Sequence, residues 1–319
     1  MSDGGKMKVL ALAGGIGGAK LAAGLQDALP PGDLTVVVNT ADDFDLWGLR
    51  ICPDLDTVMY TLAAVANPVT GWGVEDESFA TLGMLARYGE VTWFKLGDRD
   101  LATHVLRTAS LRAGETLTRI TAELSAALGV RSSILPMCDE PVATVLVTPD
   151  GPLEFQEYFV RRGQRDEVIG MELLGIRDAR PTDSVLTALA GADVVIFCPS
   201  NPLVSIGPVL AVPGMRKALL SSSVPKIAVS PIVGGRALKG PADRMLGSLG
   251  HEVSATGVAR IYEGLVDGMV IDRVDEGERA DIENLKMRVL ATDAVMRDAD
   301  DRARLAREVL EFGAGLAAR

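Results

Sequence analysis

The sequence has few of the residues that build disulfide frameworks or zinc sites. It contains three cysteines in 319 residues, none close to another, and only two histidines. Disulfide frameworks and structural zinc sites both need such residues at short, recurring spacings. The sequence therefore argues against both kinds of site. The unpaired thiols of Cys52, Cys138 and Cys198 favour a reducing compartment, and we expect a cytoplasmic protein.

Basic residues are also fewer than acidic residues. Lysine and arginine number 32 against 43 aspartates and glutamates, giving a formal net charge of −11 at pH 7. A surface of this sign repels nucleic acid and anionic lipid, so we predict neither as a partner. An anionic ligand must then be held by local groups such as backbone amides, a helix N-terminus, single cations or a metal.

Long apolar runs are absent as well. The first run, 7–13, is too short for the apolar region of a signal peptide and far too short for a membrane helix. It reads instead as a buried strand that ends in glycines and leads into a segment of helical spacing. No other run reaches a length that spans a membrane.

Short apolar runs alternate with helical segments along most of the chain. Each run ends in a loop of small or polar residues, which is typical of parallel strands buried on both faces. We predict an α/β fold in one domain, residues 1–319, with a doubly wound, mostly parallel, Rossmann-like sheet that binds ligands at the carboxyl ends of its strands. The predicted strand segments are 7–13, 34–40, 193–202 and 226–235, with helices at 213–220 and 241–249 among them.

Residues 55–180 follow a different pattern. The part up to 130 is mostly of helical spacing, and 142–160 predicts a β-hairpin whose turn contains Asp150 and Gly151. We expect this helical and β-hairpin insertion to cover the strand ends and to form part of an acceptor pocket. The segment 299–316 predicts an amphipathic terminal helix.

A glycine-rich turn follows the first predicted strand. Gly14, Gly15, Gly17 and Gly18 precede Lys20 at the start of the predicted helix. Glycines at this place let backbone amides approach phosphate oxygens, and the helix dipole adds attraction. The segment matches neither GxGxxG nor the P-loop, which disfavours NAD(P)-linked oxidoreductases and P-loop nucleotide hydrolases. The simpler alternative is a tight turn that needs glycine only for backbone reasons.

An acidic loop follows the second predicted strand. Asp42, Asp43, Asp45, Asp54 and Asp56 fall close together in sequence. Carboxylates this dense repel one another unless a cation or hydrogen-bond donors offset their charge. Mg²⁺ suits such a site because it binds one or two carboxylates and bridges to phosphate. Asp43 and Asp56 are the favoured ligands, while Asp54 is also well placed to cap a helix.

Three further loops carry polar groups. The segment 95–104 places Lys95, Asp98 and His104 around a turn into a helix, where an aspartate is as easily a helix cap as a functional group. Loops after the later strands add hydroxyls, an amide, glycine amides and two cations. The candidate residues there are Ser200, Asn201, Ser205, Gly234, Gly235, Arg236 and Lys239.

At these motifs the sequence resembles a known family, the 2-phospho-L-lactate transferases of coenzyme F-420 biosynthesis. The matching segments occur in the family's order over about residues 7–263. They are GGIGGAK, VVVNTADDF, PDLDTVMYTLA, WG-x-x-DE-SF, KLGDRDLATH, ILPMCDEPV, PSNPLVSIGPVLAVPGMR and VSPIVGGRALKGPA.

The resemblance implies an Mg²⁺-dependent, homodimeric enzyme. It would transfer a phospho-lactyl or phospho-enolpyruvyl group from a guanosine diphospho-ester to the deazaflavin Fo and release GMP. The arginine- and alanine-rich composition favours the enolpyruvyl donor, because it suggests a high-GC genome of the actinobacterial kind. By resemblance, Asp43, Asp54 and Asp56 bind the metal, and Asp56 or Asp43 takes part in catalysis. Trp72, Lys95 and Asp98 face the deazaflavin, while Gly14–Gly18, Ser200–Ser205 and Gly234–Lys239 hold the nucleotide and phosphates.

One alternative of another class stays open at this point. A related branch with similar glycine and SNP loops resembles regulatory proteins that bind UDP-sugars and act on carbon metabolism without catalysis. The PDLDT and KLGDRD segments favour the transferase. A transferase is also expected to bind the deazaflavin, which the regulator would ignore.

Overall fold

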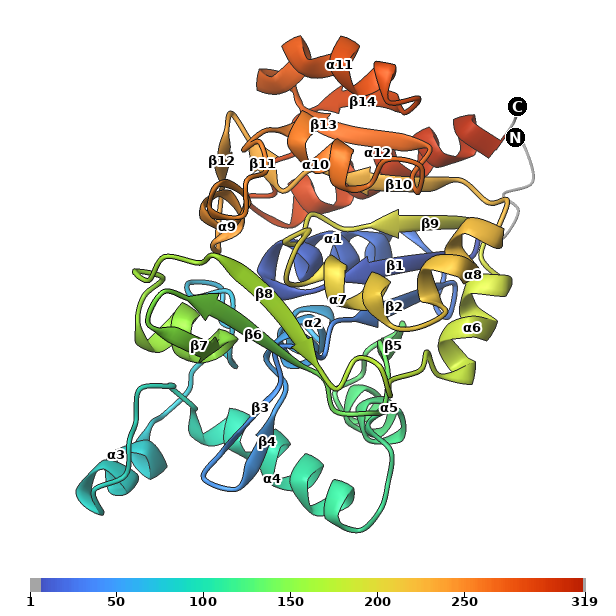
Figure 1. Ribbon diagram of the computed structural model, residues 1–319. Coiled ribbons are helices and arrows are strands. Elements are labelled where there is room, and N and C mark those ends of the chain that lie inside the picture. The colour runs from blue at the N-terminus through green and yellow to red at the C-terminus, as the bar shows by residue number, and fades with distance from the viewer. Residues whose placement is uncertain (1–6, 318–319) are drawn as a thin grey trace.

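The four predicted strand segments form neighbouring strands of one parallel sheet in the computed structural model, which describes residues 7–317 (Figure 1). Both faces of these strands are buried, which explains why their sequences are apolar at nearly every position. The sheet consists of β1 (Val9–Ala13), β2 (Leu34–Val38), β5 (Ser133–Pro136), β9 (Val194–Phe197), β10 (Lys226–Val229), β13 (Gly268–Asp272) and β14 (Arg288–Thr292).

The strand order identifies the topology. Across the sheet it is β5-β2-β1-β9-β10-β13-β14, and every neighbouring pair is parallel. The chain first builds outward from β1 through β2 to β5, then returns to β9 and builds in the other direction. The crevice between the carboxyl ends of β1 and β9 is where sheets of this kind bind ligands. The predicted doubly wound, Rossmann-like α/β fold is confirmed.

Helices cover both faces of the sheet, and alternation along the strands assigns each face its own core. On β1, Leu10 and Leu12 belong to one core and Val9 and Ala11 to the other. The first core contains α6 (Asp183–Ala190), α7 (Ile206–Ala211), α8 (Met215–Ser221), α9 (Ala242–Ser248), α10 (Ala255–Ile261) and α11 (Arg279–Asn284). The second contains α1 (Gly15–Ala28), α2 (Pro53–Leu62) and α12 (Ala299–Ala317).

Most of the remaining elements lie beyond the carboxyl end of the sheet, whereas α5 packs against the edge strand β5 (Figure 1). They comprise two antiparallel hairpins, a three-stranded sheet, three helices and two short irregular helices. Their bounds are β3 (Phe44–Leu46), β4 (Leu49–Ile51), α3 (Ala80–Arg87), α4 (Asp98–Arg112), α5 (Leu117–Ala127), β6 (Ala143–Thr148), β7 (Gly151–Glu154), η1 (Glu157–Arg161), β8 (Gly170–Leu174), β11 (Ile232–Val233), β12 (Arg236–Ala237) and η2 (Arg273–Glu278).

The predicted insertion at 55–180 corresponds to two separate excursions. β5 interrupts it, because this strand pairs with β2 at the edge of the central sheet. The beginning of the range, in α2, packs against α1 and belongs to the second core. The hairpin expected at 142–160 is present as β6 and β7, with Thr148 paired to Gly151 across the turn, and β8 adds an unpredicted third strand. The terminal helix expected at 299–316 is α12.

No helix within residues 7–317 combines the length and apolar character needed to cross a membrane.

Close contact between α1 and α12 depends on Gly24. A Cβ atom built there would overlap the carbonyl of Arg302, and Ala306 lies just beyond. We expect Gly24→Ala to lower the free energy of unfolding by about 1–3 kcal/mol, because it overfills a packed contact. The matched control is Gly315→Ala in α12, where a Cβ meets open space. That change should raise stability by up to about 1 kcal/mol through helix propensity. Urea unfolding of both variants tests the contact, and equal effects would contradict it.

Candidate active site

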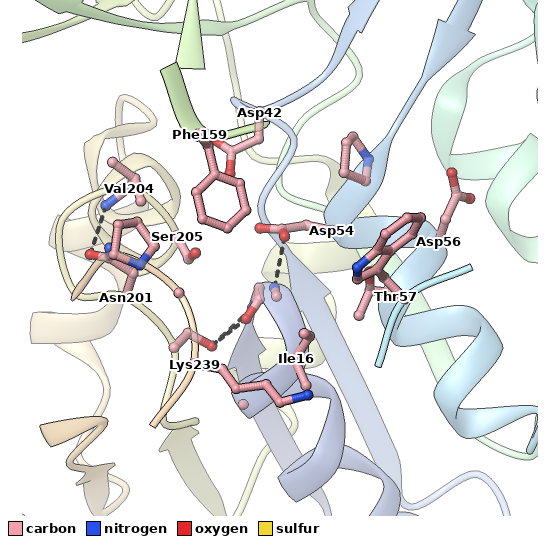
Figure 2. Close-up of a pocket in the computed structure, with 18 of the residues that line it drawn as sticks. Ile16, Asp42, Asp54, Asp56, Thr57, Phe159, Asn201, Val204, Ser205 and Lys239 are labelled. Atoms are coloured by element: carbon pink, nitrogen blue, oxygen red, sulfur yellow. Dashed lines mark hydrogen bonds between the residues drawn. The ribbon is translucent and has the colours of Figure 1, made fainter. Parts of the chain in front are cut away.

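A cavity of about 580 Å³ opens at the carboxyl end of the sheet, in the crevice between β1 and β9 (Figure 2). The sequence analysis had selected many of the residues that line it, and they come from loops far apart in the chain. Those that line it are Gly14, Gly15, Gly17, Lys20, Asp54, Asp56, Trp72, Lys95, Ser200, Asn201, Ser205 and Lys239. Those outside its lining are Gly18, Asp43, Asp98, Gly234, Gly235 and Arg236.

The glycine turn is pressed against the loop that follows β9. A Cβ at Gly17 would overlap the carbonyl of Pro199, and one at Gly18 would overlap the hydroxyl of Ser200. Gly15 has a φ of +60°, in the left-handed region that favours glycine. The hydroxyl of Ser200 accepts a hydrogen bond from the Gly14 amide (3.0 Å) and donates to the Gly14 carbonyl (2.8 Å). The glycines thus bring the two loops together.

The N-terminus of α1 offers donors to this cavity. The Gly15 amide donates to Oδ1 of Asp54 at 2.7 Å, which satisfies one of the unpaired amides at the helix start. Ile16 and Gly17 follow in the first turn, and both line the cavity. Amides in this position, together with the helix dipole, form a binding site for an anion.

Two lysines add positive charge beside the helix start. Lys20 donates to the carbonyl of Met296 (2.8 Å), and Lys239 lies 3.5 Å from the carbonyl of Thr70. Burial lowers the pKa of Lys20, and the nearby Lys239 and Arg302 lower it further. Within residues 7–317, neither lysine has a carboxylate within 4.0 Å. Two cations that face a cavity without an acidic partner favour an anionic ligand.

Asp42 and Asp54 form the acidic part of the cavity (Figure 2). Asn39 donates to Oδ2 of Asp54 (3.0 Å) and to the carbonyl of Val204 (3.2 Å), which fixes the carboxylate relative to the β9 loop. Burial raises the pKa of Asp42 well above its ordinary range, and the charge of Asp54 raises it further. Burial also raises the pKa of Asp54 to about 6.

These two carboxylates fit a divalent cation. They are buried, adjacent enough to repel each other, and open to a cavity that also has phosphate-binding features. Oxygen ligands of this kind suit Mg²⁺, whose charge would offset both the burial and the repulsion.

Asp43 faces away from this cavity, unlike its neighbour Asp42. It lines a second cavity of about 440 Å³ between the β3–β4 hairpin and the end of α4. Both of its carboxylate oxygens are enclosed and accept no hydrogen bond within the described residues. Burial raises its pKa to about 7. Its position gives no support to the predicted roles in metal binding and catalysis beside Asp54.

Asp56 lines the main cavity, but its carboxylate is already paired. Both oxygens accept hydrogen bonds from the guanidinium of Arg107 on α4. Each partner is nearly fully buried, so the pair neutralises both charges away from water. A guanidinium in this position repels a second cation and occupies both carboxylate oxygens. Asp56 also lies with Asp100 and His104 in a group whose ligand atoms are within 4.8 Å of one another, so its roles as metal ligand and proton acceptor stay predictions.

Two other predicted sites serve local structure. The carboxylate of Asp98 accepts hydrogen bonds from the Ser78 hydroxyl (2.5 Å) and from the amides of Ala80 and Thr81 (3.0 Å each), and so caps α3. This is the capping alternative rather than contact with a ligand. The Gly234 amide donates to Asp275 (2.9 Å). Gly235 and Arg236 belong to the same β11–β12 hairpin. Lys239, which follows this hairpin, lines the cavity.

Part of the cavity lining is apolar and aromatic. Trp72, Trp93, Phe94 and Phe159 line it, and Phe159 stacks on Phe155 with ring centroids 5.7 Å apart and planes 9° apart. Flat walls of this kind suit a planar ring system. The sequence analysis selected only Trp72 from this group, because isolated aromatic residues in an irregular segment have no recognisable spacing.

Some cavity residues were not selected from the sequence for a role in the site. Tyr60 was expected only to pack, Asp42 and His104 were noted without a specific role, and Asp100 and Phe159 were not chosen. Tyr60 and Asp100 are joined by a hydrogen bond of 2.8 Å. Burial raises the pKa of Tyr60 well above its usual range, and the charges of Asp56 and Asp100 raise it further. The only available signal was the spacing of Asp100 and His104, which places both on one face of a helix.

Comparison with known proteins identifies the family. The model of the family described as "2-phospho-L-lactate transferase CofD" matches residues 9–311 of this chain. The chain belongs to this family. Among its relatives, a phosphoenolpyruvate transferase of Streptomyces griseus is 46% identical over 96% of this chain and 98% of its own. A 2-phospho-L-lactate transferase of Methanosarcina barkeri is 38% identical over 95% and 97%. The family and these relatives make the protein a transferase.

A solved structure shares the fold. A member of the UPF0052 family from Bacillus halodurans superposes with a TM-score of 0.67, over 96% of this chain and 99% of that one. The two sequences are 17% identical. At this identity the likeness concerns the fold alone.

The Asp56–Arg107 pair leads to a stability prediction. Asp56→Asn should lower the free energy of unfolding by about 3–5 kcal/mol, because it leaves a buried guanidinium without its counter-charge. Replacing both partners by apolar residues, Asp56→Leu with Arg107→Met, should cost less than Asp56→Asn alone. Urea unfolding of the single and double variants checks this order. An Asp56→Asn protein as stable as the parent would mean that the pair has no such role.

Asp43 leads to a prediction about pH. Its folded-state pKa of about 7 lies above the ordinary value of 3.8, so the folded protein keeps this proton to higher pH than the unfolded chain does. Its contribution to stability is therefore full at acidic pH and is lost as the pH rises through about 7. Asp43→Asn should remove this loss, which is on the order of 1 kcal/mol per pH unit.

Urea unfolding at about pH 5 and about pH 8 measures the effect. The exposed neighbour supplies a control, since Asp45→Asn should leave the difference between the two pH values unchanged. An Asp43→Asn variant with the parent's full pH dependence would show that Asp43 does not titrate in this range.

Proposed function

We propose that this transferase moves a phospho-enolpyruvyl group from a guanosine diphospho-ester to the deazaflavin Fo, forming dehydro coenzyme F-420-0 and GMP. The observation that carries the proposal is the combination of groups in one cavity. Helix amides and two lysines suit a diphosphate, aromatic side chains suit a planar ring, and Asp42 and Asp54 line the same cavity. One cavity thus offers groups for two different substrates.

The enolpyruvyl donor is favoured over the lactyl donor by the pattern of relatives. The phosphoenolpyruvate transferases of Streptomyces griseus and Streptomyces coelicolor are 46% and 44% identical to this chain. The 2-phospho-L-lactate transferases of Methanosarcina barkeri and Methanosarcina acetivorans are 38% and 39% identical. The chain therefore shares more of its sequence with the relatives named for the enolpyruvyl group.

Mg²⁺ is the proposed cofactor, held by Asp42 and Asp54. When bound there, it would neutralise the charge of the diphosphate. The amides of Ile16 and Gly17, with Lys20 and Lys239, would bind and orient the same group from the other side. Ser200, Asn201 and Ser205 complete this wall, since Asn201 shapes the β9 loop by accepting hydrogen bonds from two of its amides.

The reaction is proposed as an in-line displacement. The primary hydroxyl of the ribityl chain of Fo attacks the phosphorus distal to the guanosine. The new O–P bond forms as the bond to the GMP oxygen breaks, and the hydroxyl loses its proton. Such transfers depend mainly on positioning and on neutralising charge. Trp72 and Lys95, which line the aromatic part of the cavity, would position the deazaflavin.

We further propose a cytoplasmic homodimer. The three cysteines are free and buried, as suits a reducing compartment. Apolar side chains on the outer surfaces of α3 and α4 are exposed, which supports an interface between two copies. They are Met84 on α3 and Val105 and Leu106 on α4, with Phe79 and Tyr88 flanking α3. The alternative of a non-catalytic regulator that binds UDP-sugars is not retained, because the relatives are transferases.

The proposed reaction predicts a product that can be measured directly. Incubation of the protein with Fo, the guanosine diphospho-ester of enolpyruvate and Mg²⁺ should release GMP and give an Fo derivative heavier by the transferred group, both detected by mass spectrometry. Chelation of Mg²⁺ should stop the reaction. Absence of GMP with both substrates and Mg²⁺ present would refute the proposed function.

Lysine variants test the proposed binding of the diphosphate. Lys239→Gln should raise the KM for the guanosine donor by roughly 10- to 100-fold, the range expected when a charge-assisted hydrogen bond is lost. The KM for Fo should change much less. Lys217→Gln, an exposed lysine on α8, serves as the control.

A further inference from the structure

Helix α4 buries its polar side, which is the reverse of an ordinary amphipathic helix. Its buried residues are all polar, namely Asp100, His104, Arg107 and Thr108, whereas Val105 and Leu106 are exposed. Burying polar groups costs free energy unless each finds a partner. A helix that places its polar side inward therefore has an inner face suited to chemistry rather than to packing.

The inner face of α4 forms a directed network of hydrogen bonds. Arg107 can only donate, so its Nη1, 3.2 Å from Nδ1 of His104, makes that ring nitrogen the acceptor. The proton of a neutral imidazole then resides on Nε2, which lies 3.1 Å from Oδ1 of Asp100 without meeting the geometry of a hydrogen bond. Tyr60 on α2 donates to the same oxygen at 2.8 Å.

This arrangement leaves one oxygen of Asp100 available. Oδ1 accepts a hydrogen bond from Tyr60 and lies 3.1 Å from Nε2 of His104, while Oδ2 accepts no hydrogen bond within residues 7–317 and is not among their fully enclosed atoms. Asp100, Tyr60 and His104 all line the main cavity. Glu77 holds the start of α4 by accepting hydrogen bonds from the amides of Arg99 and Asp100 (2.8 and 2.7 Å). The carboxylate is therefore fixed in position beside the cavity, with one oxygen free of hydrogen bonds.

We infer that Asp100 is the residue that accepts the proton from the attacking hydroxyl group, with Tyr60 and His104 as positioning residues. This inference rests on the proposed function and names a base for it. In the step, Oδ2 of Asp100 takes the hydroxyl proton as the hydroxyl oxygen forms its bond to phosphorus. The electron pair of the broken P–O bond leaves on the GMP oxygen, so atoms and charge balance.

The other interpretation of this cluster is a second metal site. Asp56, Asp100 and His104 offer ligand atoms within 4.8 Å of one another. However, the guanidinium of Arg107 contacts both Asp56 and Nδ1 of His104, so a positive charge already occupies one side of the cluster. A proton acceptor is compatible with this neighbour, whereas a divalent cation would be repelled by it.

The test compares two substitutions at the same position. In Asp100→Asn the amide oxygen can still accept from Tyr60, but the side chain can no longer take a proton. We expect kcat for GMP release to fall by about 10²- to 10⁴-fold, with KM values within about threefold of the parent. Asp100→Glu keeps the acid one methylene farther out and should retain a kcat between those of the parent and Asp100→Asn. Asp183→Asn, exposed on α6, is the control and should leave kcat unchanged.

His104 supplies the test of positioning. His104→Ala removes the ring that lies between Arg107 and Asp100 and should lower kcat by up to about 100-fold. His104→Gln offers an amide donor in its place and should restore part of that loss. His251→Gln, at the exposed second histidine of the chain, should leave kcat unchanged.

Two results would overturn the assignment of Asp100. One is an Asp100→Asn protein with a kcat within about threefold of the parent. The other is an equal loss in Asp100→Asn and Asp100→Glu, which would indicate a structural role. Failure of the unmodified protein to release GMP would instead refute the proposed function. Binding of Fo to each variant, measured through the change in the deazaflavin spectrum, confirms that the cavity is intact.

Discussion

The close approach of two loops, one after β1 and one after β9, is the constraint on which the rest of this site depends. It requires glycine at positions 17 and 18, where any side chain would overlap the neighbouring loop. Ser200 then closes the gap by bonding to both backbone groups of Gly14. Because Asn39 joins Asp54 to the same β9 loop, three strand ends are locked together. The start of α1 and the acidic side chains therefore keep a fixed mutual position.

The other half of the cavity is built on this base by helix pairing. α2 belongs to the core beside α1, and its polar residues face the inner side of α4. The buried ion pair between Asp56 and Arg107 costs desolvation that its own attraction only partly repays. Such a pair specifies one arrangement of two helices strongly, since any other arrangement would leave a buried charge unpaired. Here that arrangement brings Asp100 to the cavity.

The sequence predicted the fold well because strand burial and glycine turns are local patterns. It did not reveal β13 and β14, nor that β5 returns to the central sheet, because pairing at a distance has no local signature. Within the acidic loop, Asp42 and Asp43 face different cavities, and adjacency in sequence does not distinguish them. Likewise, Asp98 caps α3 while Asp100, two residues later, faces the cavity. Arg107, which pairs with Asp56, lies fifty-one residues away in sequence, and the sequence did not predict this pairing because it has no local signature.

The polar contacts between α2 and α4 also bear on where the cavity can open to admit a ligand. Separating these helices would leave the charges of Asp56 and Arg107 unpaired, so we expect α2 and α4 to keep a fixed relative position. α3, by contrast, has no buried residue, and the neighbouring Trp72 is itself partly exposed. Movement that admits a substrate therefore has its lowest energetic cost at α3 and the segment before it.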